Sequence, residues 1–260
     1  MKYFFFLLFL FIMNFQLLAQ NKQHENNITH DDSLALEKVI VERYYVADTS
    51  DYNKLLKNSL PQGAVTYRIF IDMKPGYKLQ LVYGNQKHEL FIETTTKFYN
   101  DVNADAITGF NVNTKIINKG NIALDSWITM GAGARGYTGI LRSEDTTDIS
   151  FITNRPSLKI ADGLTKGILP DFKIFNLDLG IFNNDSTATR FSTTNGGWAA
   201  LGGVKGPTPE NRVLIAQLTT DGNLSFAINV QIGTPSGGYV KFVAKNPEVS
   251  EIEFDGLNFK

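Results

Sequence analysis

Residues 212–232 limit the possible folds of this chain more than any other stretch. The first part, 212–219, is apolar on both faces, which is typical of a central strand. After the turn residues Asp221 and Gly222, apolar and polar side chains alternate as in a half-buried strand; the apolar set is Leu224, Phe226, Ile228, Val230 and Ile232. We therefore expect a β-rich core built on a hairpin, with Leu218 opposite Leu224 and Gly222 left-handed in a three-residue loop.

Further strands are predicted along the chain from β-branched and aromatic residues and from alternation. Residues 77–83 and 88–94 are expected to pair as a second hairpin about Gly84 and Asn85. One short helical stretch is expected at 51–57, capped by Ser50. Glycine-rich loops are expected at 131–139 and 196–211. The other expected strands are 39–46, 64–73, 122–130, 149–153, 172–175, 239–244 and 251–254.

Many short strands with glycine turns and almost no helical periodicity predict an all-β fold. We expect an antiparallel β-sandwich, jelly-roll-like or Ig-like, with one short helix at most. The sandwich is expected to form a single domain at 37–260, since all-β domains often reach this size.

The first residues read as an export signal. Lys2 is followed by an apolar run and by a small-residue cleavage pattern, which predicts a signal peptide at 1–20. An uncleaved membrane anchor is the competing interpretation, but the apolar run is short for a bilayer span. Residues 21–36 are polar and unpatterned, and are predicted to be a disordered spacer. The expected location is secreted, periplasmic or at the surface of a Gram-negative cell.

Composition excludes several classes of function. The chain has no cysteine, so thiol catalysis and cysteine-bound metals are excluded. A formal charge of −1 does not suggest nucleic acid as a partner, and no stretch after the signal peptide is apolar enough to span a membrane.

Four groups of residues carry a resemblance to known sequences: 41–45, 65–69 with Asp72-Met73 and Pro75-Gly76-Tyr77, 124–127, and 211–217. Together they resemble a family of uncharacterised secreted β-domains from Bacteroidota. The resemblance covers residues 41–238, and its most specific part is 211–222. It implies export and a β-domain fold, and it implies no activity.

A calcium-like spacing occurs at Asp101, Asn103 and Asp105. Alternate oxygens at D-x-N-x-D positions can face one hard cation, which makes calcium a possible cofactor. Position six of the motif is Ala106 and position twelve is Val112, so a complete helix–loop–helix site is excluded. A solvated Asx turn is the competing interpretation.

Aromatic side chains near glycine loops are candidates for stacking on sugar rings. Trp198, Tyr137 and Tyr239 are the candidate ligand-binding residues, because each lies in or beside a predicted loop. Trp127 lies within a predicted strand and is expected in the core. His88 lies on an apolar strand face, where a buried, hydrogen-bonded histidine is expected rather than a member of a catalytic triad.

Three functions from different classes remain open. We expect an exported, non-enzymatic module of the cell envelope that binds a surface polymer such as a glycan, with no catalytic residue assigned. The alternative is a carbohydrate-active hydrolase or lyase that uses loop carboxylates such as Asp125, Glu144, Asp145 and Asp148. The third is a structural or adhesive module that contacts another envelope protein.

Overall fold

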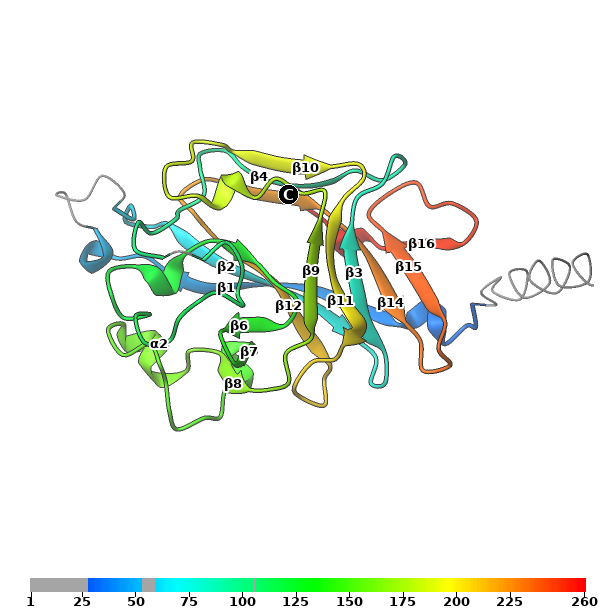
Figure 1. Ribbon diagram of the computed structural model, residues 1–260, viewed down its shortest axis with the longest axis horizontal. Coiled ribbons are helices and arrows are strands. Elements are labelled where there is room, and N and C mark those ends of the chain that lie inside the picture. Colours follow the sequence, from blue (N-terminus) through cyan, green and yellow to red (C-terminus); the bar gives the residue numbers. More distant parts are fainter. Residues whose placement is uncertain (1–27, 53–58, 105) are drawn as a thin grey trace, which may run out of the picture.

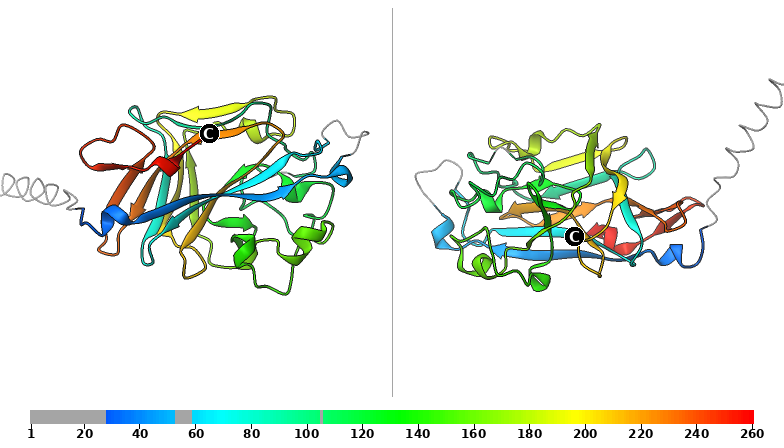
Figure 2. Two further views of the ribbon diagram at one scale, coloured as in Figure 1. Left: turned by 180° about the vertical axis from the view of Figure 1, so that it is seen from behind. Right: turned by 60° about the horizontal axis from the view of Figure 1, so that its bottom comes forward.

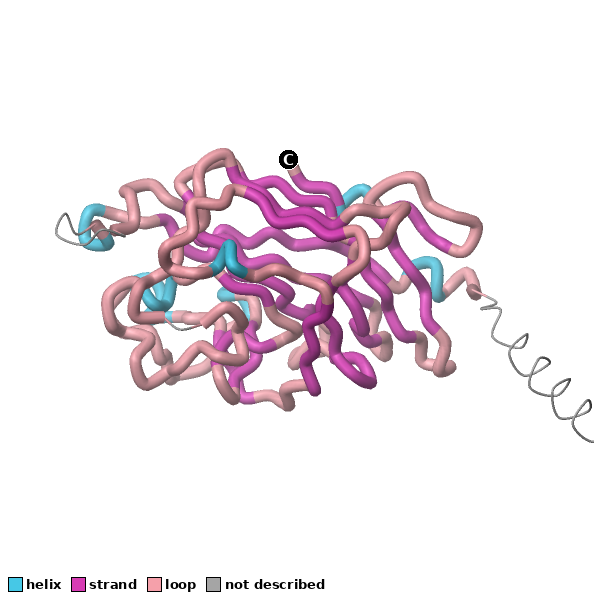
Figure 3. The backbone as a smooth tube through the Cα atoms, turned by 45° about the horizontal axis from the view of Figure 1, so that its top comes forward, coloured by secondary structure: helices cyan, strands magenta, loops and turns pink. Residues whose placement is uncertain are grey.

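The computed structural model of the protein describes residues 28–52, 59–104 and 106–260. The predicted signal peptide, residues 21–27 of the predicted spacer, residues 53–57 of the predicted helix and Asp105 lie outside the described residues. Within them the chain forms strands joined by long loops and a few short helical turns (Figure 3).

Two sheets contain the longest strands. Sheet A has the order β1 (Leu36–Val46), β2 (Val65–Met73), β12 (Arg212–Thr220) and β5 (Trp127–Ile128). Sheet B has the order β16 (Glu251–Glu253), β15 (Tyr239–Val243), β14 (Asn229–Gly233), β3 (Lys78–Tyr83), β11 (Gly197–Val204) and β9 (Asp171–Phe175). All of these pairs are antiparallel except β15 with β16, which run parallel.

Two smaller antiparallel sheets complete the architecture. Sheet C has the order β10 (Arg190–Thr193), β4 (Leu90–Thr94), β13 (Leu224–Ala227) and β17 (Asn258–Phe259). Sheet D has the order β6 (Ala132–Ala134), β7 (Tyr137–Gly139) and β8 (Leu164–Lys166). Sheet C lies at the top of Figure 1, and sheet D lies at the lower left beside α2 (Pro156–Ile160).

Helical structure is limited to α2 and short 3-10 turns in the described part of the chain. The prediction of an all-β, sandwich-like fold with one short helix at most is therefore confirmed. None of the helices found there is both long and apolar enough to cross a membrane. The turns are η1 (Asp32–Leu34), η2 (Thr49–Asp51), η3 (Ile122–Leu124), η4 (Arg142–Glu144), η5 (Gly180–Phe182) and η6 (Asp255–Leu257).

The larger hydrophobic core lies between one face of sheet A and sheets B and C. Alternation along β2 places Ile69 and Ile71 on this face, and both are fully buried. Every second residue from Leu224 to Ile232 is buried in the same core, as predicted for the apolar set, but Ala227 and Asn229 of the opposite set are buried as well. The prediction that 212–219 is buried on both faces is also confirmed.

The second face of sheet A is also covered, and it carries a polar network. Arg68 on β2 is 2% exposed and lies 3.6 Å from the centre of the Tyr44 ring. Its Nε donates to Oε1 of Gln217 at 2.9 Å, and its Nη1 donates to the carbonyl oxygens of Asp162 and Gly163. These partners satisfy a guanidinium that would otherwise be costly to bury. A second, smaller core lies under the loops of residues 97–166.

The predicted hairpin of 77–83 with 88–94 is wrong. β3 pairs with β11 and β14 in sheet B, whereas β4 pairs with β10 and β13 in sheet C. The connection of residues 84–89 is longer than predicted, and its tight turn lies two residues later, with Asn85 and His88 exchanging backbone hydrogen bonds of 2.8 and 3.2 Å. Gly84 is required by crowding, since a Cβ there would lie 2.1 Å from the carbonyl oxygen of Thr193.

The central hairpin prediction is wrong in the same way. β12 pairs with β2 and β5, and β13 pairs with β4 and β17, so Leu218 does not face Leu224. The φ angle of Gly222 is not positive. The chain therefore leaves sheet A at the Asp221-Gly222 turn and enters sheet C. It passes into sheet B one residue after β13, where the backbone N–H of Ile228 donates to the carbonyl of Leu257.

Some local boundaries also differ from the predictions. Residues 28–36, expected to be part of a disordered spacer, contain η1 and the first residue of β1, and Asp32 accepts a hydrogen bond from the hydroxyl of Tyr77 at 3.0 Å. The predicted strand 122–130 is η3 followed by the two residues of β5, and 149–153 is a loop. The predicted glycine loop 131–139 contains the buried hairpin of β6 and β7. The strands predicted at 39–46, 64–73, 172–175, 239–244 and 251–254 are present with small changes in their ends.

Candidate functional site

Trp198 does not lie in an exposed loop as predicted. It is on β11 between Val82 of β3 and Ile174 of β9, and it is 0% exposed. The glycines beside it allow neighbouring backbones to approach: a Cβ on Gly197 would lie 2.3 Å from the carbonyl oxygen of Val82. Local composition predicted a loop, but strand pairing on both sides makes this residue part of the core, so its ring cannot stack on a ligand.

The two tyrosine candidates differ in exposure. Tyr137 is half-buried on β7, and its ring centre lies 4.4 Å from that of Phe151. Tyr239 begins β15 and is 40% exposed, with the Nζ of Lys241 6.0 Å from its ring centre. Tyr239 therefore keeps a free aromatic face, whereas Tyr137 serves packing. Trp127 is 1% exposed, which confirms its predicted place in the core.

The predicted calcium residues are held by hydrogen bonds of their own. Asp101 is buried; its Oδ1 accepts from the backbone N–H and the side-chain amide of Asn103, at 2.8 and 3.1 Å. Its Oδ2 accepts from the hydroxyl of Tyr99 and the backbone N–H of Asn121. This is the pattern of an Asx turn. With Asp105 outside the described residues, no group of three or more acidic or histidine side chains in the remainder could hold a metal ion.

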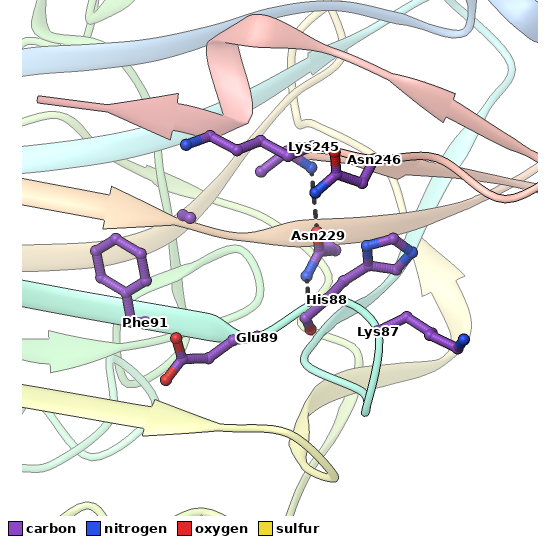
Figure 4. Close-up of a pocket in the computed structure, with 9 residues that line it drawn as sticks. Lys87, His88, Glu89, Phe91, Asn229, Lys245 and Asn246 are labelled. Carbon is purple, nitrogen blue, oxygen red and sulfur yellow. Dashed lines mark hydrogen bonds between the residues drawn. The ribbon is translucent and has the colours of Figure 1, made fainter.

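His88 is buried and hydrogen-bonded, as predicted. Its Nε2 lies 2.6 Å from Oε2 of Glu251 on β16, and both side chains are 3% exposed. A cavity of about 190 Å³ adjoins it, with Lys87, Lys245 and Asn229 in the lining (Figure 4). The amide of Asn229 is already occupied, because it donates to the carbonyls of Tyr83 and His88 and accepts from the backbone of Ala244. This cavity is small, and its central polar group has structural partners.

The loop carboxylates considered for hydrolysis are also engaged within the chain. Glu144 forms an ion pair with Arg212, and Asp145 accepts from the backbone N–H of Gly163 at 2.8 Å. Asp125 is 1% exposed. None of these three groups is among the residues that line the four cavities described for residues 28–52, 59–104 and 106–260.

A larger polar site than the His88 cavity is a groove along one edge of the molecule, formed by four chain connections. Two adjoining cavities of about 470 and 520 Å³ share Lys78 and Lys205 in their lining. The connections are the β2–β3, β8–β9, β11–β12 and β14–β15 turns, which lie along the lower edge of Figure 1. We call these two cavities together the lysine groove.

Glycines and irregular strand pairing create this groove. On β11, Ala199 pairs with Leu81 and Val204 pairs with Leu79, so residues 200–203 bulge away from β3, while Ala200 and Leu201 stay paired with β9. Gly203 has a φ of +73°, and a Cβ there would lie 2.8 Å from the Cβ of Lys78. Only glycine fits such a position, and its missing side chain leaves room in the groove.

The floor of the groove includes the amide of Gln80. The pairing of β3 with β14 also skips Gln80, since Gln231 faces Leu81 and Ile232 faces Leu79. The Oε1 of Gln80 accepts from Nε2 of Gln231 at 2.9 Å. A Cβ on the neighbouring Gly233 would lie 2.4 Å from Nε2 of Gln80. The groove therefore offers amide groups beside glycine backbone.

The charge of the groove is positive. Lys78, Lys166 and Lys205 line it, all three are exposed, and none takes part in an ion pair within the described ranges. The lining of the two cavities contains no Asp or Glu. Three exposed lysines in a lining without carboxylates favour a local positive potential on a chain whose net charge is −1.

Sequence reasoning missed the lysine groove. Its lysines are about 40 to 130 positions apart and come from three different connections. The available local signal was the glycine that directly follows two of them, Gly167 after Lys166 and Gly206 after Lys205. Tyr239 was predicted as a ligand residue, and the structure places it beside the groove: it follows the lining residue Gly238 and pairs with Gly233.

No family model matches this chain, and no curated protein or solved structure matches it either. Function is therefore inferred from the geometry of the groove.

Proposed function

We propose that this protein is an exported, non-enzymatic module of the cell envelope that binds an acidic polysaccharide in the lysine groove. The observation that carries the proposal is the set of three exposed lysines without ion pairs, Lys78, Lys166 and Lys205, around a glycine-lined groove whose lining has no carboxylate. Ammonium groups free of internal partners can pair with ligand carboxylates or sulfates without first breaking an existing ion pair.

Two further features support a sugar polymer as the anion. The groove is open at the surface and combines cavities of about 470 and 520 Å³, which suits a ligand that extends beyond the site. Tyr239 offers an exposed ring beside it, and an aromatic face is suited to the apolar face of a sugar ring. The resemblance to secreted Bacteroidota domains supports a location at the cell envelope. This location is a prediction.

Replacing the groove lysines tests the proposal. We expect the full chain to bind a polyuronate in a calorimetric titration, and the variant Lys78→Gln, Lys166→Gln, Lys205→Gln to bind at least about tenfold more weakly, a loss of about 1.4 kcal/mol. Binding should also weaken strongly at about 1 M salt, where the screening length falls to about 3 Å.

A matched control has the same change in net charge at a different place. Lys115, Lys119 and Lys159 are exposed and have no ion pairs in the part of the chain that the structure describes. Their triple change to Gln should leave the affinity within about twofold. An equal loss of polyuronate affinity in both triple variants would contradict the proposal. So would a neutral glucan that binds the natural chain as tightly as the polyuronate does. Tyr239→Ala separates the stacking contribution from the charge contribution.

A further inference from the structure

We infer that the free edge of β1 pairs with β1 of a second copy of this chain, in antiparallel register about Ile40. Among the strands that the structure describes, β1 is at the edge of sheet A and pairs only with β2. It runs the length of the molecule along one side, as the two views of Figure 2 show in blue. The inference is independent of the lysine groove, which lies on other strands.

The edge is open for hydrogen bonding. Between Lys38 and Arg43 the pairing with β2 is regular, and register shifts occur only next to these two ends. Within the described residues, the backbone groups of 38–43 have no backbone partner outside the β1–β2 pair. In an antiparallel pair, half of the N–H and C=O groups of an edge strand point away from its neighbour and can accept another strand.

The charges along this edge are self-complementary. The segment reads Glu37, Lys38, Val39, Ile40, Val41, Glu42, Arg43. When two copies pair antiparallel with Ile40 opposite Ile40, Lys38 faces Glu42 of the other copy, and Glu37 faces Arg43. The twofold axis repeats the Glu37–Arg43 contact, so two opposite-charge pairs between exposed side chains flank a centre of Val39, Ile40 and Val41.

Three of the four side chains that would form the facing pairs are available, whereas Glu42 is half-buried and its Oε1 accepts from the backbone N–H of Arg142 at 2.9 Å. Glu37, Lys38 and Arg43 are exposed, and in the described part of the chain none of them is in an ion pair. Charged residues on an edge usually prevent strand association, because like charges meet when copies pair. In the register centred on Ile40, opposite charges meet instead. A shift of the register by two residues in either direction removes these opposite-charge contacts.

Charge reversal tests the register. By sedimentation equilibrium we expect the natural chain, residues 28–260, to be a dimer at micromolar concentration. Arg43→Glu should place two carboxylates opposite each other at two symmetric places and weaken the dimer at least about tenfold. Glu37→Arg should do the same with two guanidinium groups. The double variant Glu37→Arg, Arg43→Glu restores opposite charges and should recover the dimer.

A cross-link provides a second measurement that does not depend on charge. The chain has no cysteine, so a single introduced thiol can form a disulfide only between copies. In the proposed register Ile40 lies on the twofold axis, where opposed Cα atoms are about 4.5 to 5.5 Å apart, within disulfide range. Ile40→Cys should cross-link on mild oxidation, whereas the more exposed Lys38→Cys should not, because position 38 faces position 42.

The outcomes decide the inference. Recovery of the dimer in the double variant, together with cross-linking at position 40 but not at 38, supports it. A natural chain that is monomeric at about 100 μM, a dimer that survives Arg43→Glu, or a double variant that stays monomeric while its circular dichroism is unchanged would overturn it.

Discussion

The surroundings of the Asp125 side chain strongly oppose its ionic form. Its Oδ1 accepts from the backbone N–H of Asp101 at 2.7 Å, whereas its Oδ2 is buried and has no hydrogen-bond partner among the described residues. Burial raises the pKa of Asp125 well above its usual value of 3.8, and the nearby carboxylate of Asp101 raises it further. A carboxyl group in such a place is most stable in its protonated form.

This pKa shift predicts a pH dependence of stability. Above pH 3.8 the unfolded chain releases the Asp125 proton while the folded chain retains it, so this group lowers the free energy of unfolding as pH rises towards its folded pKa. Asp125→Asn keeps an acceptor for Asp101 and does not titrate. We expect urea unfolding to show the variant gaining on the natural chain by about 1 kcal/mol or more between pH 4 and pH 8. A stability difference that is constant with pH would contradict this account.

Among the elements, the turn between β12 and β13 depends on packing and not on a left-handed glycine. The hydroxyl of Thr220 lies 2.6 Å from that of Thr94, and the hydroxyl of Thr96 donates to Asp221 at 2.6 Å. A Cβ on Gly222 would lie 2.7 Å from each of three threonine hydroxyl oxygens in residues 94–96. Glycine is therefore required here because the loop after β4 occupies the space of a side chain.

Two substitutions distinguish crowding from backbone conformation. At Gly136, φ is +80° and no atom lies within 4 Å of the place that a Cβ would take, so only the backbone opposes a change. Asn tolerates positive φ better than Ala does. Gly136→Ala should therefore lower the free energy of unfolding by about 1 kcal/mol, and Gly136→Asn should lower it by less. At Gly222 we expect the reverse order, with Gly222→Ala costing about 1 to 3 kcal/mol and the larger Asn more. Thermal unfolding measures all four variants, and the same order at both sites would contradict the crowding explanation.

Strands could be predicted from the sequence, but their partners could not. Burial of the apolar set at 224–232 and of the run at 212–219 follows from side-chain polarity, and both were predicted correctly. The hairpin predictions also assumed that two strands adjacent in the sequence pair with each other in one sheet. β12 instead found β2, about 150 residues away, and β13 found β4. The lysine groove and the burial of Trp198 were missed for the same reason, since each depends on strands brought together from distant segments.

At the scale of the whole molecule, the two cores share their central strands. Phe70 and Leu214 face the smaller core, whereas Ile69 and Val213 face the larger one. Neighbouring residues of β2 and β12 therefore stabilise both. Neither core can lose its packing without exposing one face of sheet A, which predicts a single cooperative unfolding transition.

The fluorescence of the two tryptophans can report the unfolding of each core separately. Trp127 lies in the smaller core and Trp198 in the larger one. In Trp198→Phe the fluorescence reports the smaller core, and in Trp127→Phe it reports the larger. Within each variant we expect urea transitions followed by fluorescence and by far-ultraviolet circular dichroism to have the same midpoint. A fluorescence midpoint in Trp198→Phe well below that of circular dichroism would mean that the layer of residues 97–166 unfolds by itself.

The order of the strands in the chain has a consequence for how the protein is made. Residues from Arg212 onward supply β12 to sheet A, β14 to β16 to sheet B, and β13 and β17 to sheet C. β17 pairs with β13, and the ring of Phe259 stacks on Phe226 at 5.2 Å. During translation, the three largest sheets thus lack internal strands until the last part of the chain has left the ribosome. The nascent chain must stay unfolded through most of its synthesis, and its exposed strands then require protection from premature association.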